Sequence, residues 1–268
     1  VILLGSIVTH YKWVKWFTRM VKRHHPETKL VVGNSVGGSC FEVFFRNTPA
    51  DVVVVGEGEI SCLEVLNAFR DGRSIEGIAG IVYRAKDGSP VHAPPRKAGD
   101  IDGFPMIEWD SFDVPRYLQK CDRSTGLDPS AKGSITFPVV SARGCVFKCT
   151  FCHYVFWDDP YRKRVAGKIV AEIRRNIEKY GANYISFWDD LSFCSIAQVE
   201  KMTDAILASG LKFKWDAAVR VDLFGNPQIP YERRLNAARK MKESGCVAVG
   251  FSLESGDEDI LLMINKKI

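Results

Sequence analysis

The chain has 268 residues, of which 46% are hydrophobic and 26% are charged, and its formal net charge is +5 at pH 7. This composition is typical of a globular protein with one large domain or two ordinary ones. The positive charge is mild and spread over both halves, so it indicates solvated helix faces and predicts no nucleic-acid partner. No apolar run approaches the roughly 20 residues that a membrane-spanning helix needs.

The cysteines indicate a reducing compartment. Five of the eight stand singly and three are clustered, unlike the disulfide framework of a small secreted protein. They are Cys40, Cys62, Cys121, Cys145, Cys149, Cys152, Cys194 and Cys246. We therefore expect a cytoplasmic protein, and we find no signal peptide. Because the chain begins with Val1 inside a predicted strand and ends abruptly with Ile268, we also expect a fragment truncated at both ends.

The front of the chain alternates strands and helices. Short apolar runs predict buried strands over 1–8, 29–33 and 51–59, and the second is followed by the turn-rich stretch 34–39. Helical spacing predicts two amphipathic helices, over 11–25 with the apolar face Trp13, Phe17, Met20 and Val21, and over 61–72 with the apolar face Leu63, Leu66 and Phe69.

This alternation implies an α/β fold with a partial doubly wound parallel sheet, whose glycine turns lie at the carboxyl ends of the strands, where such sheets bind ligands. We assign residues 1–84 to this domain. A hairpin is predicted around Asp87-Gly88. Residues 85–135, rich in Pro, Gly, Asp and Ser from residue 94 onwards, are expected to link two domains.

From Phe137 the alternation restarts and predicts four strand–helix units that run in one direction. The strands are expected over 137–144, 182–190, 212–222 and 246–255, and the helices over 168–181, 197–210, 231–245 and from 257 onwards. Residues 136–268 are therefore predicted to form a partial (β/α) barrel, which would carry its active site at the carboxyl ends of the strands.

Cys145, Cys149 and Cys152 lie on the loop after the first of these strands. Thiolates are soft ligands suited to zinc and to iron–sulfur clusters. Four ligands close a structural zinc site, and the local sequence lacks a fourth because His153 is adjacent to Cys152. A distant cysteine could still complete such a site. The other interpretation is a 4Fe–4S cluster with one iron left open for a substrate-like ligand.

The stretch RGCVFKCTFC, residues 143–152, resembles the signature of the radical S-adenosylmethionine (SAM) enzymes, including the aromatic Phe151 before the last cysteine. The resemblance implies that the three cysteines hold a 4Fe–4S cluster whose open iron binds the amino and carboxylate groups of SAM. Reductive cleavage of SAM would give a 5′-deoxyadenosyl radical, which takes a hydrogen atom from an unreactive carbon. A reductant such as flavodoxin or ferredoxin would supply the electron.

The same resemblance assigns SAM contacts to later strand ends. Asp189 and Asp190 stand where the superfamily contacts the methionine amino group, although Asp-Asp replaces the common Gly-Gly-Glu form and, followed by Phe193, resembles the cobalamin-linked branch. Arg220 could pair with the methionine carboxylate, and Asp222 is expected to cap a helix.

The fourth strand end carries Ser252 and Glu254, also assigned to SAM, where a carboxylate suits the ribose hydroxyls. The alternative for each of the predicted acidic contacts is an ordinary carboxylate at a helix N-terminus.

The front half resembles the Rossmann-like, cobalamin-binding half of cobalamin-dependent radical SAM proteins, on the stretches 31–39, 50–66 and 101–118. By that resemblance, the nucleotide tail of cobalamin would lie against Ser6, Gly33, Asn34, Gly56, Glu57 and Gly58. The family often has glycine where Asn34 stands, and asparagine tolerates a left-handed backbone. The cobalt-ligating motif Asp-x-His-x-x-Gly is absent, and we expect His10, His24, His25 and His92 at the surface.

The sequence therefore predicts a cobalamin-dependent radical SAM enzyme of anaerobic chemistry. Methyl transfer to an unactivated carbon of a small-molecule, lipid or peptide substrate is expected first, with ring formation or another rearrangement as the alternative. A radical SAM methylthiotransferase would need three more cysteines in front, where only Cys40 and Cys62 stand outside any such pattern. A non-catalytic zinc module or electron-carrying cluster protein is the alternative of a different class.

Overall fold

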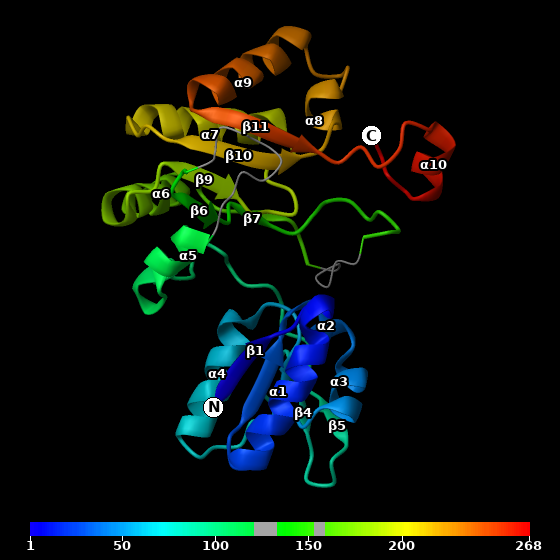
Figure 1. Ribbon diagram of the computed structural model, residues 1–268. Coiled ribbons are helices and arrows are strands. Elements are labelled where there is room, and N and C mark those ends of the chain that lie inside the picture. The colour runs from blue at the N-terminus through cyan, green and yellow to red at the C-terminus, as the bar shows by residue number, and fades with distance from the viewer. Residues whose placement is uncertain (121–132, 153–158) are drawn as a thin grey trace. The chain divides into compact units, whose positions relative to one another are not determined.

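The computed structural model describes residues 1–120, 133–152 and 159–268 (Figure 1). The chain divides into two compact units, which are described separately. The first contains residues 1–99, and the second contains residues 100–152 and 160–268. No helix among the described residues is long and apolar enough to cross a membrane.

The first unit is built on a five-stranded sheet. In spatial order its strands are β1 (Ile2–Gly5), β2 (Leu30–Gly33), β3 (Val52–Val54), β4 (Ile81–Arg84) and β5 (Pro90–His92). The first three strands are parallel, so their carboxyl ends meet at one edge, as the sequence predicts.

The predicted hairpin is confirmed, because β4 and β5 pair antiparallel. The hairpin also joins the sheet, because β4 runs antiparallel to β3. The reason lies in the connection after α4 (Gly58–Arg70). The residues from Asp71 to Gly80 carry the chain back to the carboxyl end of β3, where the Val55 amide donates to the Gly80 carbonyl at 2.9 Å.

Helices cover both faces of this sheet. After the 3₁₀ turn η1 (Val8–His10), α1 (Tyr11–His24) packs with α3 (Phe41–Asn47) against one face. The helix α4 packs against the other face through Val65. The stretch predicted as turn-rich forms a short helix, α2 (Asn34–Ser39).

The predicted apolar faces of α1 and α4 need correction. In α1 the buried side chains are Val14, Thr18 and Val21. Thr18 can be buried because its hydroxyl donates a hydrogen bond to the Val14 carbonyl at 2.8 Å. Trp13 is half exposed and stacks on Phe17 instead. In α4 the helix buries Ser61, Val65 and Ala68 and leaves Leu63 exposed.

The second unit alternates strands and helices as predicted. The region expected to be a linker contains, besides β5, the 3₁₀ turn η2 (Trp109–Ser111) and the helix α5 (Val114–Lys120). The strands that follow are β6 (Thr136–Val139), β7 (Ala142–Arg143), β8 (Arg162–Lys163), β9 (Tyr184–Phe187), β10 (Lys214–Val219) and β11 (Cys246–Phe251). The helices are α6 (Ala166–Tyr180), α7 (Ile196–Ser209), α8 (Asp222–Gly225), α9 (Tyr231–Glu243) and α10 (Glu258–Met263).

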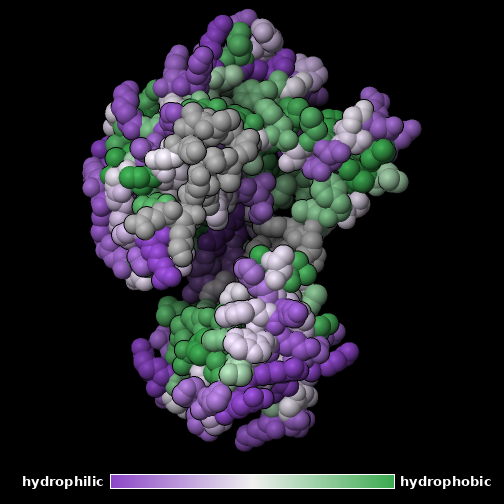
Figure 2. Space-filling view, viewed as in Figure 1, coloured by the Kyte–Doolittle hydropathy of each residue, from purple (hydrophilic) through white to green (hydrophobic). Residues whose placement is uncertain are grey.

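Four of these strands form one parallel sheet in the order β11-β10-β9-β6, while β7 and β8 pair as a small antiparallel ribbon (Figure 1). Helices α6, α7 and α9 pack on one face of the sheet around the buried Trp215. In the described residues the sheet is open, with β6 and β11 at its edges, which confirms the predicted partial barrel. Hydrophobic side chains remain exposed around β11 and α10, including Phe251 and Leu262 (Figure 2).

Gly245, in the turn before β11, is a position where a side chain cannot fit. Its φ is +95°, and a Cβ there would overlap the Phe213 carbonyl oxygen. Gly210 also has a positive φ, +70°, but a Cβ there would meet nothing within 4 Å. We expect Gly245→Ala to lower the free energy of unfolding by at least about 3 kcal/mol and Gly210→Ala by about 1 kcal/mol, measured by urea denaturation. Equal losses would contradict the packing described for this turn.

Candidate functional site

The three clustered cysteines lie at the carboxyl edge of the second sheet. The loop begins at Gly144, whose φ of +91° disfavours any side chain and where a Cβ would lie only 3.1 Å from the Pro160 carbonyl oxygen. Cys149 is buried, Cys145 is half-buried and Cys152 is exposed, and all three are free thiols. The Cys152 amide donates to the Cys149 carbonyl at 3.1 Å, which turns the end of the loop back on itself.

Burial raises the pKa of the Cys145 thiol, and so do the neighbouring Cys149 and Asp190, whereas the Phe147 amide and the Arg220 guanidinium lower it. Burial is also the main reason why the pKa of Cys152 is raised. A bound metal would have to supply the positive charge that deprotonates these thiols.

The described residues contain no three metal-ligating side chains that are close enough to hold a single ion. This arrangement gives the zinc interpretation no support. It does not argue against a cluster, because each cysteine of a 4Fe–4S cluster binds a different iron and the thiols therefore stand farther apart.

Arg220 comes directly after β10 and reaches under the cysteine loop. It is buried, its Nη1 lies 4.0 Å from Cys149 Sγ, and its guanidinium lies over the Phe147 ring at 3.5 Å from the centroid. The Nε atom donates to Asp222 at 3.2 Å. The Nη2 atom is buried and has no hydrogen-bond partner within the described residues. A buried donor without a partner is rare in native proteins, so this atom fits an anionic group bound beside the loop.

Asp189 is placed at the predicted strand end, but protein groups already occupy its carboxylate. It accepts hydrogen bonds from the Ser141 amide at 2.7 Å, the Ser141 hydroxyl at 2.6 Å and the Ala142 amide at 3.0 Å. These bonds hold the turn between β6 and β7. Protein groups thus already bind the Asp189 carboxylate, and the SAM contact expected for Asp189 stays a prediction.

Asp190 is different from its neighbour. It is exposed, and the described residues give its carboxylate no hydrogen-bond partner. Surrounding protein atoms still remove part of the water around its carboxyl group, and this desolvation and the adjacent Asp189 charge raise the pKa of Asp190. Of the two acids, Asp190 is thus the one that is available to a ligand.

This difference predicts opposite results for a matched pair of substitutions. We expect Asp189→Asn to lower the free energy of unfolding of the second unit by about 2 kcal/mol, because an amide cannot accept all three bonds. Asp190→Asn should change it by less than about 0.5 kcal/mol. Urea denaturation of the metal-free protein measures both, and a larger loss for Asp190→Asn would contradict the assignment.

Ser252 and Glu254 follow β11 and are exposed. Glu254 has a φ of +68°, a left-handed backbone that is uncommon for glutamate and is often found at functional sites. Its carboxylate pairs with Lys266 at 3.2 Å. Phe151, the predicted aromatic contact in the cysteine loop, is also half exposed.

Lys163 supports the same edge of the sheet. Its ammonium donates to the Ser192 carbonyl at 2.6 Å and lies over the Phe193 ring at 4.2 Å. Burial lowers its pKa to about 8, although the nearby Asp189 acts in the opposite direction.

The Lys163 pKa predicts a pH dependence of stability. The folded chain releases this proton near pH 8, while the unfolded chain keeps it up to about pH 10.5, so unfolding takes up a proton between these values. The stability of the wild type relative to Lys163→Met should therefore rise with pH in this window. Urea denaturation under reducing conditions from pH 7.5 to 10 tests this, and exposed Lys201→Met should keep the wild-type slope. A flat difference would contradict the buried charge.

The cobalamin contacts predicted in the first unit gather at the carboxyl edge of its sheet. Ser6 follows β1, and its amide donates to the Gly33 carbonyl at 3.0 Å. Asn34 has a φ of +72° and Gly56 a φ of +82°, so both turns have left-handed residues, as expected for Asn34. Glu57 and Gly58 begin α4 on the same edge. The Ser6 hydroxyl is buried without a hydrogen-bond partner in the described chain, which fits a polar group bound there.

The four described histidines are exposed, as the sequence predicts for His10, His24, His25 and His92. Cys121 and His153 lie outside the described residues.

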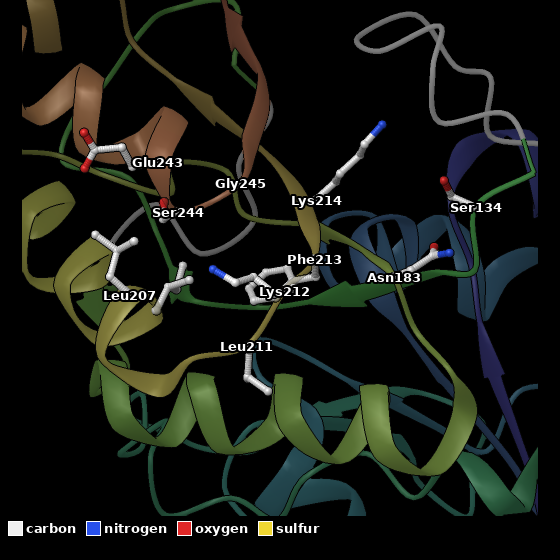
Figure 3. Close-up of a pocket in the computed structure, with 11 residues that line it drawn as sticks. Ser134, Asn183, Leu207, Leu211, Lys212, Phe213, Lys214, Glu243, Ser244 and Gly245 are labelled. Carbon is white, nitrogen blue, oxygen red and sulfur yellow. The ribbon is translucent and has the colours of Figure 1, made fainter.

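A pocket of about 500 Å³ lies at the other end of the second sheet. Asn183, Lys214 and Gly245, at or just before the starts of β9, β10 and β11, contribute to its lining (Figure 3). Parallel α/β sheets bind ligands beyond the carboxyl ends of their strands, and this pocket is at the amino ends. It is therefore separate from the cysteine site.

Sequence reasoning missed Lys163 and Lys266, because a buried lysine leaves no local signal. It also missed Asp216, a buried carboxylate that accepts from Tyr184 at 2.9 Å and Ser186 at 2.7 Å on the adjacent strand. The alternating pattern of β9 and β10 could have indicated that these polar residues share one face.

Fold and site together define a class: an α/β protein with a three-cysteine loop at the carboxyl edge of an open parallel half-barrel. The sequence profile of the Radical SAM superfamily matches residues 139–268, just under half of the chain, so this part is similar to the radical SAM domains.

Three curated relatives resemble the chain. An uncharacterized methyltransferase of Pyrococcus horikoshii, PH0819, is 29% identical over 230 residues, covering 85% of this chain and 45% of the relative. The cytidylyl-2-hydroxyethylphosphonate methyltransferase of Streptomyces wedmorensis is 26% identical over 90% of this chain and 47% of its own length. The anaerobic magnesium-protoporphyrin IX monomethyl ester cyclase of Rubrivivax gelatinosus is 25% identical over 93% and 42%. The chain thus spans about half the length of these relatives.

The fold is shared with a solved structure of the cobalamin-dependent S-adenosylmethionine radical enzyme OxsB, which holds aqua-cobalamin and S-adenosylmethionine. The TM-score is 0.81 at 19% identity, and the match covers 100% of this chain and 37% of that one. The expected fold, a partial doubly wound sheet followed by a partial radical SAM barrel, is confirmed.

Proposed function

We propose that the chain is the cofactor-binding part of a cobalamin-dependent radical SAM methyltransferase. The observation that carries the proposal is the buried Arg220, whose unpaired nitrogen lies beside the cysteine loop at the carboxyl edge of the radical SAM domain. The unpaired guanidinium nitrogen of Arg220, next to cysteines that would hold a cluster, suits a ligand that carries a carboxylate, as SAM does.

Different residues of the second unit would bind the iron–sulfur cluster and SAM. Cys145, Cys149 and Cys152 would hold a 4Fe–4S cluster, and Arg220 would hold the methionine carboxylate. The bound cluster would supply the electron that cleaves SAM and so the radical that removes a hydrogen atom from the substrate.

The remaining predicted SAM contacts differ in how well the structure supports them. Asp190 offers a free carboxylate to the methionine amino group, whereas the carboxylate of Asp189 acts through the β6–β7 turn. Phe151, Ser252 and Glu254 are exposed on the loop and at the end of β11, where they can contact the adenosine.

For cobalamin we propose Ser6, Gly33, Asn34, Gly56, Glu57 and Gly58 as contacts of the nucleotide tail. Ser6 would satisfy its buried hydroxyl there, and the glycine turns allow close backbone approach. Two relatives named as methyltransferases support methyl transfer, and an unactivated carbon is the acceptor that we propose. The cyclase among the relatives keeps ring formation as the second candidate.

Substrate, partners and location complete the proposal. The substrate would be a small molecule, lipid or peptide, and flavodoxin or ferredoxin would donate the electron. A cytoplasmic location suits the free thiols of the described residues, which an oxidising compartment would attack. Neither comparison nor site favours a methylthiotransferase or an electron carrier.

The proposal is tested with the full-length protein, reconstituted without oxygen, supplied with hydroxocobalamin and desalted. We expect retained corrinoid absorbance and, with SAM and reductant, release of 5′-deoxyadenosine and transfer of a labelled methyl group to substrates in an extract. Loss of all corrinoid on desalting would overturn the cobalamin part. Cleavage of SAM without methyl transfer, but with a cyclised product, would favour the second candidate.

A further inference from the structure

The segment 264–266 lies against the cysteine loop, although more than a hundred residues separate them. The Asn265 side-chain amide donates to the Lys148 carbonyl at 2.7 Å, and the Thr150 amide donates to the Ile264 carbonyl at 2.9 Å. Lys148 directly precedes Cys149 and Thr150 directly follows it, so the two contacts hold the loop backbone on both sides of this cysteine. The segment therefore limits the movement of the loop that carries the cysteines.

Local chemistry explains why the chain turns back at this point. Asp257 caps the start of α10 by accepting from the Ile260 amide at 3.1 Å. The helix ends at Met263, and Asn265, two residues further on, has a left-handed φ of +53°. The Asn265 amide donates to the Leu262 carbonyl and the Lys266 amide to the Leu261 carbonyl, the paired bonds of a Schellman C-cap. This cap sends Lys266 back towards the sheet.

Lys266 joins two of the proposed SAM contacts. Its side chain is only 5% exposed, and its ammonium pairs with Glu254 at 3.2 Å. The same ammonium lies 5.8 Å from the centroid of the Phe151 ring, within range of a cation–π contact. A buried lysine is rare in proteins unless its charge is paired, so the burial of Lys266 indicates a role in holding this part of the structure.

We infer that Asn265 and Lys266 are positioning residues that clamp the cysteine loop to the end of β11 and so hold Phe151 and Glu254 together for the adenosine of SAM. The inference rests on the proposed function. Asn265 fixes the loop backbone, while Lys266 sets the distance between one contact on the loop and one after β11. Glu254, the partner of Lys266 in this ion pair, also has a left-handed backbone.

The first test compares three lysine variants of the full-length protein. Lys266→Met should keep the iron content and the reduced-cluster signal but weaken SAM affinity about tenfold, the loss typical of one charged contact. Lys266→Arg should restore most of the affinity, and Lys267→Met, at the exposed neighbouring position, should match the wild type. Equal affinity in Lys266→Met and Lys267→Met would overturn the inference. Loss of iron that Lys266→Arg does not restore would also overturn it, since Lys266 would then be only scaffold.

The second test needs no cofactor. Asn265→Gly keeps the left-handed cap but removes the bond to Lys148. In the metal-free protein we expect faster hydrogen exchange at the Thr150 amide, while the core amides of β10 stay protected. Unchanged exchange at Thr150 would overturn the clamp. If the wild type itself bound no SAM, the proposed function would fail, but this exchange result would still decide the clamp.

Discussion

Cys149→Ser is expected to abolish the cluster and to reduce SAM cleavage by at least about a thousandfold. Cys149 is the buried member of the three cysteines and lies against Arg220, so a serine there removes a soft ligand where nothing else can replace it. Iron content and 5′-deoxyadenosine release measure the effect. Cys194→Ser is the matched control, because Cys194 is exposed and follows β9 on the same edge of the sheet.

If the three clustered cysteines hold the cluster, only one of these two variants should lose iron. Cys194→Ser should keep the wild-type iron content and activity. A Cys149→Ser protein that still held about four irons and cleaved SAM would show that the cysteines do not hold the cluster.

Arg220→Met is expected to weaken SAM binding by roughly 10- to 150-fold, the loss of one charged hydrogen bond of about 1.5–3 kcal/mol. Arg220→Lys should not restore binding. A planar guanidinium can donate to Asp222 and to a ligand carboxylate at the same time, whereas a lysine ammonium lacks this geometry. Equilibrium dialysis with labelled SAM measures both variants.

Arg233→Met is the control for this experiment, because Arg233 is an exposed arginine that pairs with Glu200. It should bind SAM as the wild type does. Wild-type affinity in Arg220→Met would mean that the unpaired nitrogen serves another group, and the carboxylate role would be withdrawn.

Much of the fold could be predicted because it follows local periodicity. The apolar runs before Gly33 and Gly56 form strands of one sheet, and the four strand–helix units after Phe137 form another. The cysteine spacing is equally local. The predicted contacts outside the cysteine loop follow β9, β10 and β11, and parallel strands bring their carboxyl ends to one edge.

The rest depends on contacts between distant residues. The position of Asp189 at a strand end predicts a ligand contact, but its hydrogen-bond partner Ser141 lies 48 residues earlier and leaves no local signal. The role of Asn265 depends on Lys148, 117 residues away. The α1 face was misassigned because Thr18 satisfies its own hydroxyl within the helix, which makes a polar residue fit for burial.

The most direct test of the central claim is electron paramagnetic resonance of the anaerobically reconstituted, reduced protein, with and without SAM. We predict a reduced 4Fe–4S signal that changes shape when SAM is added, because three cysteines would leave one iron open to the methionine group whose carboxylate Arg220 would bind. A signal that SAM leaves unchanged would point to electron transfer, and bound zinc without a cluster would contradict the account.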